Sequence, residues 1–218
     1  MNWVHTLWPM FSAAGLTLAL VYCLAWVRTP TRISQLLIGA AAASVAMVGL
    51  FELAAMNAVD TDGYTRMVRW AHVPVATSAI CVVGFVYHHY GVGSPVLAAI
   101  AIATRIACLG PNFLTGANLN YATIDSLRRV DFLGAQVSIP DVATANPWML
   151  LGTGNALLVM LFLVHAIVQL AARRPSAERT RAIATCATIL AYVVAAGTWT
   201  WGRGPARVSA WKAKPRRT

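Results

Sequence analysis

Apolar segments about as long as a bilayer is thick recur along this chain, and they constrain its fold more than any other feature. A helix that crosses the hydrocarbon core needs about 20 mainly apolar residues. Six segments are candidates, of which the fourth is short and contains Arg105: Trp8–Val27, Ile33–Ala58, Trp70–Tyr90, Pro95–Leu109, Trp148–Ala171 and Arg181–Trp201. We therefore expect an all-α, polytopic transmembrane helical bundle of about six spans.

The composition agrees with a membrane domain and leaves little chain for anything else. Hydrophobic residues make up 58% of the sequence and charged residues 11%, whereas soluble domains have roughly 25% charged residues. A transmembrane domain over residues 1–202 uses nearly all of the 218 residues. No phosphate-binding, zinc-protease or nucleophile-elbow motif occurs in the sequence. We therefore expect neither a kinase nor any other catalytic module, and no enzyme activity.

The positive charge is concentrated in a basic tail. The net charge is +10, and residues 203–218 hold six basic residues and no acidic one. Arginine and lysine clusters beside apolar segments are typical of membrane topology and of contact with anionic lipid. The expected partner is therefore the lipid bilayer and not nucleic acid.

The arginines also indicate an orientation. The connections Arg28–Arg32 and Arg173–Arg181 carry six Arg and would share one side of the membrane, which the positive-inside rule makes cytoplasmic. The N-terminus is then external. With six spans the basic tail also ends outside, against that rule, so we expect a missing seventh span, a predicted span that does not cross, or a tail along the bilayer surface.

The longest connection, 110–147, mixes apolar residues with Asn and Gly turn formers. Such a mixture can pack back onto a bundle, and long ordered loops are often functional. We expect an extracytoplasmic loop that forms a lid over the outer end.

Three ionisable residues lie within or beside predicted spans, where an unpaired charge is costly and therefore indicates function. Glu52 and Arg105 lie late in two outward-running spans, and His72 lies at the outer start of a third. We expect Glu52 and Arg105 to pair, and His72 to lie near the same level. Such a pair can also be purely structural.

Asparagines near the same level add amide donors and acceptors. Asn112, Asn118 and Asn120 belong to the long connection, and Asn155 lies in the fifth predicted span. These amides could line a polar pocket under the loop, although asparagine is also common in turns. The segment Gly152–Asn155 is expected to be a helix-packing notch.

A different arrangement of histidines supports a rival interpretation. His88, His89 and His165 are expected at the inner ends of two spans, where histidines from separate helices could ligate haem or hold a metal. Histidines at a membrane interface also occur without a ligand. The polar-pocket interpretation predicts no cofactor, whereas the histidine interpretation predicts haem. The four cysteines show no CxxC spacing and are expected to be core residues.

Four short segments, in this order, resemble a known family. They are Arg69–Pro74, Asn112–Tyr121, Phe132–Gly134 and Asn146–Met149. They resemble the N-terminal seven-helix sensor region of bacterial membrane histidine kinases and related PAS-containing signalling proteins, and the likeness spans most of residues 1–200.

The resemblance implies a multi-pass sensory input domain in the bacterial inner membrane, with a periplasmic long loop. This sequence departs from the family in its basic tail, in lacking a seventh helix and in lacking PAS, dimerisation and ATP-binding modules. We therefore expect a truncated sensor that works as a homodimer or with a separate cytoplasmic signalling protein. A haem- or quinone-binding redox subunit and a small transporter are the alternatives.

Overall fold

The chain folds into six helices and one β-hairpin over its described part. This computed structural model describes residues 2–201, of which 196–201 by their backbone alone, so the predicted basic tail 203–218 lies outside the described residues. The elements in order are α1 (Val4–Arg28), α2 (Ile33–Met56), α3 (Thr61–Tyr90), α4 (Pro95–Leu114), β1 (Tyr121–Phe132), β2 (Ala135–Ala145), α5 (Met149–Ala171) and α6 (Ala177–Trp201).

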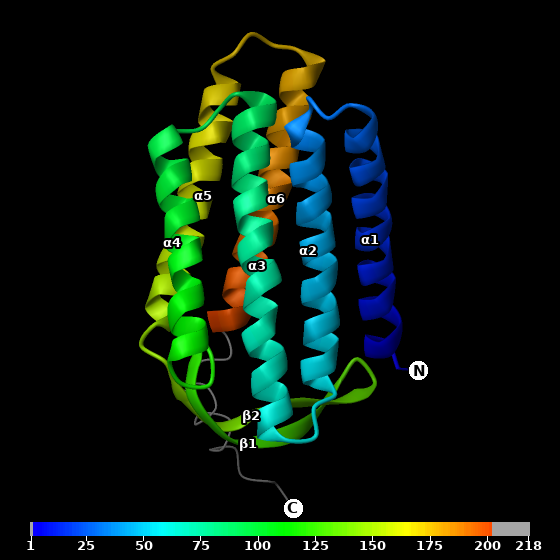
Figure 1. Ribbon diagram of the computed structural model, residues 1–218, viewed down its shortest axis with the longest axis vertical. Coiled ribbons are helices and arrows are strands. Elements are labelled where there is room, and N and C mark those ends of the chain that lie inside the picture. The colour runs from blue at the N-terminus through cyan, green and yellow to red at the C-terminus, as the bar shows by residue number, and fades with distance from the viewer. Residues whose placement is uncertain (1, 202–218) are drawn as a thin grey trace, which may run out of the picture.

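The helices run alternately up and down between two unlike ends (Figure 1). One end, called here the arginine-rich end, holds the connections 29–32, 91–94 and 172–176, and the hairpin lies at the other. Within the described residues, five helices, α1 to α5, are long and apolar enough to cross a bilayer. Large apolar side chains also point outward from them, including Phe11, Leu150 and Leu157, which are 73%, 72% and 60% exposed. These apolar helices and their exposed apolar side chains indicate a multi-pass membrane protein.

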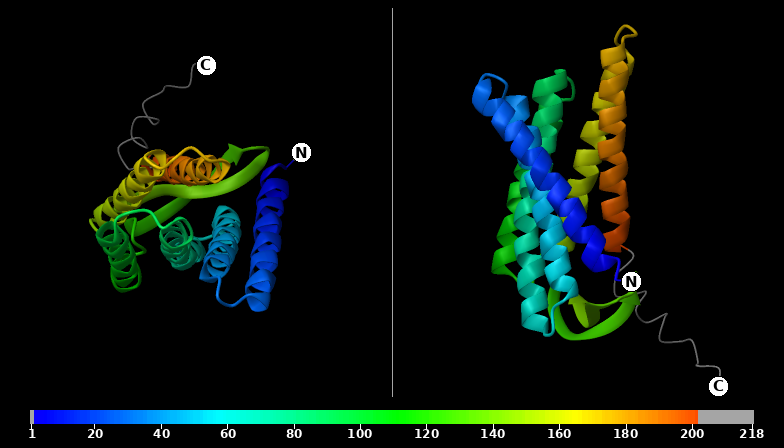
Figure 2. Two further views of the ribbon diagram at one scale, coloured as in Figure 1. Left: turned by 90° about the horizontal axis from the view of Figure 1, so that it is seen from above. Right: turned by 90° about the vertical axis from the view of Figure 1, so that its right-hand side faces the viewer.

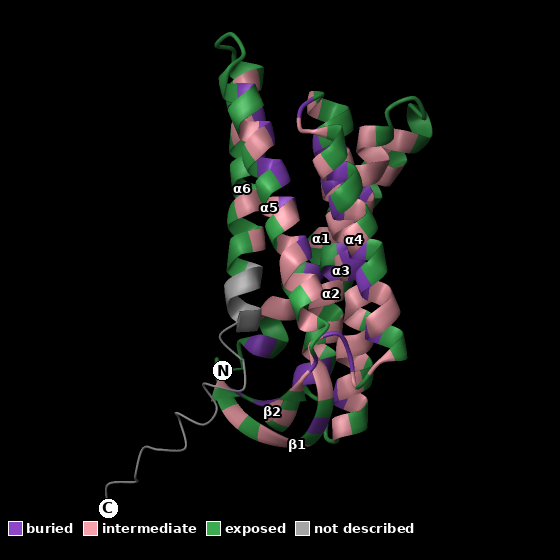
Figure 3. Cartoon of the chain, turned by 90° about the vertical axis from the view of Figure 1, so that its left-hand side faces the viewer, coloured by how far each residue is buried: buried purple, intermediate pink, exposed green. Residues whose placement is uncertain are grey.

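The helices form two layers, with the main core where the layers meet. Seen from above, α1 to α4 stand in a row in chain order, while α5 and α6 form a second layer (Figure 2). The largest cluster of buried residues joins α3, α4, α5 and α6, and Phe162 and Leu163 of α5 are fully buried in it. Figure 3 shows α6 exposed along much of its length. Among the element pairs with substantial contact, α6 packs only on α5.

Side-chain caps place two helix starts. The Asp60 side chain accepts a hydrogen bond of 2.6 Å from the Gly63 amide, so α3 begins at Thr61, nine residues before the predicted span at Trp70. The Ser94 hydroxyl accepts from the Leu97 amide, and Pro95 follows as the first helical residue. Both are standard N-caps, which satisfy amides that the first turn leaves unpaired.

The long connection is not a loop, and the expected all-α class is corrected here. Helix α4 continues to Leu114, and β1 and β2 then pair as an antiparallel hairpin. Leu133 and Gly134 form the tight turn, with φ of 50° and 76°. Positive φ at both central residues is what two-residue hairpin turns require. Asn-Gly is the usual signal for such a turn, and its absence from this sequence concealed the hairpin.

The hairpin does cover one end of the bundle, as the lid interpretation expected. Val137 of β2 packs with Val4 and Met56 from the ends of α1 and α2, and Ile124 of β1 packs with Tyr64 of α3. The Ser138 hydroxyl donates to the Ala58 carbonyl at 2.6 Å. These contacts close the lower ends of α1, α2 and α3.

Helices α1 and α2 meet closely because glycines remove side chains from their interface. A Cβ atom on Gly15 would lie 3.0 Å from the Ala46 Cβ and 3.2 Å from the Ala42 carbonyl oxygen. A Cβ on Gly49 would lie 2.9 Å from the Ser12 hydroxyl oxygen. Small residues let helix backbones approach in lipid, where dispersion contacts drive association.

We predict that Gly15→Ala lowers the thermal unfolding midpoint of the purified protein, because the methyl group must push α1 away from α2. Overpacking of this kind costs about 1–3 kcal/mol. Gly154→Ala is the matched control, since a Cβ at that helical glycine meets nothing within 4 Å. A Gly15→Ala midpoint at or above that of the control would contradict the close interface.

Candidate functional site

Arg105 is buried inside the bundle, and among the described residues its side chain has no hydrogen-bond or ion-pair partner. It lies on α4 with 8% of its surface exposed. Its Nε and Nη2 atoms are buried and donate to no acceptor within the described part of the chain. A guanidinium remains charged in proteins, so this group carries a positive charge into the protein interior, and no carboxylate of the described residues forms an ion pair with it.

His72 of α3 faces the same region. Both of its ring nitrogens are buried and, among the residues described, have no hydrogen-bond partner. The imidazole lies within electrostatic range of Arg105, which the packing of α3 on α4 explains. Two neighbouring helices therefore each direct an unsatisfied polar side chain into one region, as the sequence predicted for these two residues.

Asn155 holds α5 against α4 one turn from Arg105. Its side-chain amide donates to the Ala101 carbonyl at 2.7 Å, and the residue is buried. A Cβ on Gly152 would lie 3.1 Å from a methyl group of Leu119. Both observations fit the packing notch that the sequence indicated for 152–155.

The expected ion pair between Glu52 and Arg105 is wrong. Glu52 is exposed on α2 and accepts a hydrogen bond of 3.3 Å from the indole of Trp8 on α1. Its carboxylate interacts electrostatically with the Tyr192 hydroxyl of α6. Similar depth along two spans does not make two residues neighbours, because α3 stands between α2 and α4 in the row (Figure 2).

The asparagines hold the hairpin's root in place. The Asn112 amide donates to the Arg69 carbonyl at 2.9 Å, and its oxygen accepts from the Leu119 amide at 3.1 Å. The Asn118 oxygen accepts from the backbone amides of Asn120 and Tyr121. The Asn120 side chain itself makes no hydrogen bond in the described part.

Two further residues complete this network and were not singled out from the sequence. Arg69 donates from Nε to the Ala117 carbonyl and from Nη2 to the Gly116 carbonyl, at 2.8 and 2.7 Å. The Asn146 amide donates to the Asn118 carbonyl at 2.8 Å. Both belong to segments that carried the family resemblance, which was the available signal for them.

The three histidines of the redox alternative do not meet. His88 and His89 are exposed at the arginine-rich end of α3, where the ring of His89 stacks on Phe85 at 4.9 Å. His165 lies on α5, and its Nδ1 atom is buried with no hydrogen-bond partner in the part of the chain that the structure describes. Over residues 2–201, no three His, Cys, Asp or Glu side chains gather closely enough to hold a metal ion.

Comparisons of the chain with protein-family models, with curated proteins and with solved structures give no match. The geometry of Arg105 and His72 is therefore the basis for any functional assignment.

We predict that Asn112→Ala destabilises the protein by about 1–3 kcal/mol, because it leaves the buried Leu119 amide and the Arg69 carbonyl unsatisfied. Asn120→Ala is the matched control at the same turn, and it should change the midpoint of thermal unfolding little. Equal effects of the two substitutions would contradict the structural role of Asn112.

Proposed function

We propose that this chain is a membrane-embedded sensory input domain that binds a small anionic ligand between α3 and α4, at Arg105 and His72. The observation that carries this proposal is the buried guanidinium of Arg105, which has no ion pair or hydrogen bond among the described residues. Burying an unpaired charge costs several kcal/mol, so such residues are retained where a ligand or a transported ion supplies the missing partner.

The chemistry of the two side chains selects the ligand class. Arg105 presents a planar guanidinium that binds carboxylates in a bidentate manner, and His72 can donate or accept one further hydrogen bond. A small carboxylate therefore satisfies both groups at once. The apolar neighbours of the site would exclude water and strengthen the contact.

A signalling role needs the ligand to favour one helix arrangement over another. The site joins α3 and α4, and both helices lead directly to the hairpin's root through Arg69 and Asn112. A shift of α4 against α3 would therefore act on the hydrogen bonds of Gly116 and Ala117. Three of the four segments that resemble histidine kinase sensor regions meet in this network, which supports the same assignment. In this proposal the output comes from a separate cytoplasmic protein or from a homodimer.

Ligand binding is tested with the full chain in lipid nanodiscs, using acetate, succinate, citrate and benzoate as probes. At least one carboxylate should raise the thermal midpoint of the unchanged protein. Arg105→Gln should abolish that increase. In the absence of ligand, Arg105→Gln should raise stability by about 1–3 kcal/mol, because it removes an unpaired buried charge.

Arg66→Gln is the control for loss of a positive charge, because Arg66 is exposed and lies in the same half of α3 as His72. It should keep the carboxylate response and leave the basal midpoint unchanged. His72→Gln should weaken carboxylate binding about ten-fold, the effect of losing one hydrogen bond to a charged group. If Arg105→Gln destabilises the protein and no anion shifts the unchanged protein, Arg105 is structural and the proposal fails.

The sensory part of the proposal is tested separately by hydrogen exchange. Bound carboxylate should change exchange at the Gly116 to Tyr121 backbone, away from the ligand itself. Binding that protects only α3 and α4 would contradict signalling, and carboxylate flux into liposomes would then assign transport instead.

A further inference from the structure

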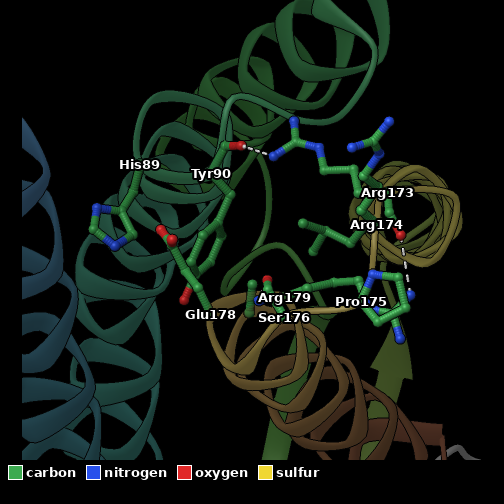
Figure 4. A pocket seen from close by; sticks show the side chains of 10 residues that line it. His89, Tyr90, Arg173, Arg174, Pro175, Ser176, Glu178 and Arg179 are labelled. Carbon is green, nitrogen blue, oxygen red and sulfur yellow. Dashed lines mark hydrogen bonds between the residues drawn. The ribbon is translucent and has the colours of Figure 1, made fainter.

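A polar cavity lies at the arginine-rich end, far along the helices from the hairpin. It has a volume of about 380 Å³ and is enclosed by the end of α3, the end of α5 and the start of α6 (Figure 4). Its lining includes Tyr90, Arg173, Arg174, Ser176, Glu178 and Arg179. Three guanidinium groups and a single carboxylate make this cavity positively charged. Its volume falls within the range of small-ligand pockets.

Two of the arginines are held in place by backbone carbonyls. Arg173 donates to the carbonyls of Tyr90 and Gly91 at 3.0 and 2.9 Å, where α3 ends. Arg179 donates to the carbonyls of Ala171 and Arg173 at 3.3 and 3.1 Å, where α5 ends. Figure 4 shows the bonds from Arg173 to Tyr90 and from Arg179 to Arg173. The carbonyls orient both guanidinium groups but bring no full negative charge.

Donors remain unused in the same cavity. The Nε atom of Arg179 is buried and has no acceptor among the described residues. Arg174 lines the cavity, and its side chain makes no hydrogen bond or ion pair within residues 2–195. A guanidinium offers five donors, so these groups present several N–H bonds to a ligand with oxygen acceptors.

The position of the cavity identifies the source of such a ligand. The connections at this end carry six Arg and one acidic residue, Glu178, over residues 28–32 and 172–181. The positive-inside rule assigns such an end to the cytoplasmic side, where the leaflet carries anionic lipid. Because the apolar helices α3 and α5 end here, a bilayer that they cross would have its lipid headgroups at the level of the cavity.

We propose that this cavity binds a phosphate group, and that in the membrane the phosphate belongs to an anionic phospholipid headgroup. Arg174 and Arg179 contact the phosphate oxygens, while Arg173 acts as a positioning residue. The bound headgroup links the start of α6 to the ends of α3 and α5. Without it, the main packing contact of α6 is with α5. This site is distinct from Arg105 and does not depend on the proposed function.

The test measures lipid binding to the full purified chain by native mass spectrometry, with phosphatidylglycerol against phosphatidylcholine. Arg174→Gln is the test variant, because the Arg174 side chain makes no hydrogen bond or ion pair with the residues that the structure describes. Arg181→Gln is the matched control, since it removes the same charge at the same end from an exposed residue outside the cavity. Phosphatidylglycerol should bind preferentially, and Arg174→Gln should weaken it about five-fold, while Arg181→Gln leaves it unchanged.

A second arm distinguishes the source of the phosphate. Inorganic phosphate at millimolar concentration is added to detergent-purified protein, and the thermal midpoint is followed for the unchanged chain and both variants. Stabilisation by inorganic phosphate that Arg174→Gln removes, without any preference for phosphatidylglycerol, keeps the phosphate site but overturns its assignment to lipid. Equal weakening by Arg174→Gln and Arg181→Gln, or no response to either probe, overturns the site itself.

Discussion

The whole structure depends on one constraint, which is that lipid offers no hydrogen bonds to a polypeptide backbone. Helices satisfy it locally, and six of them account for most of the described residues. The one extended segment lies at an end of the bundle and pairs its own strands. Where that pairing begins, Arg69, Asn112 and Asn118 supply the missing donors and acceptors. These polar residues of the hairpin root therefore help to complete the fold.

Buried polar side chains also need a hydrogen-bond partner within the protein. Asn155 has one, because its buried side-chain amide donates to the Ala101 carbonyl and joins α5 to α4. Arg105, one turn along α4, has no such partner among the described residues, and neither has His72 on the adjoining helix. An asparagine with a partner explains packing, whereas the unpaired cation is the group that the proposed ligand would satisfy. That contrast between near neighbours is the physical basis of the proposed ligand site.

The two ends of the bundle have opposite character. At the hairpin end, strands and side chains cover the helix ends, and acidic residues lie among the basic ones, as in the ion pair of Arg128 with Asp141. At the arginine-rich end, short connections leave helix carbonyls for Arg173 and Arg179 to bind. Cations at helix C-termini are favoured by the helix dipole, and at this end the arginines lie beside a cavity. An input site between α3 and α4 and a phosphate site at the membrane surface would both act on the position of the helices.

Much of the helical architecture could be predicted from the chain alone, because spans are a property of local composition and their hydropathy needs no partner. The sequence by itself determined that the chain has several helices long and apolar enough to cross a membrane, and it singled out His72 and Arg105, whose side-chain nitrogens are buried in the structure. The helix boundaries predicted from the sequence were less accurate, because α3 begins at the Asp60 cap, well before the apolar stretch, and α4 continues past Pro111. It missed the hairpin because Leu133-Gly134 lacks the usual turn signal, and it paired Glu52 with Arg105 by depth alone. Which side chains meet was decided only by the tertiary structure, because the order of helices around the bundle depends on packing between segments distant in the chain.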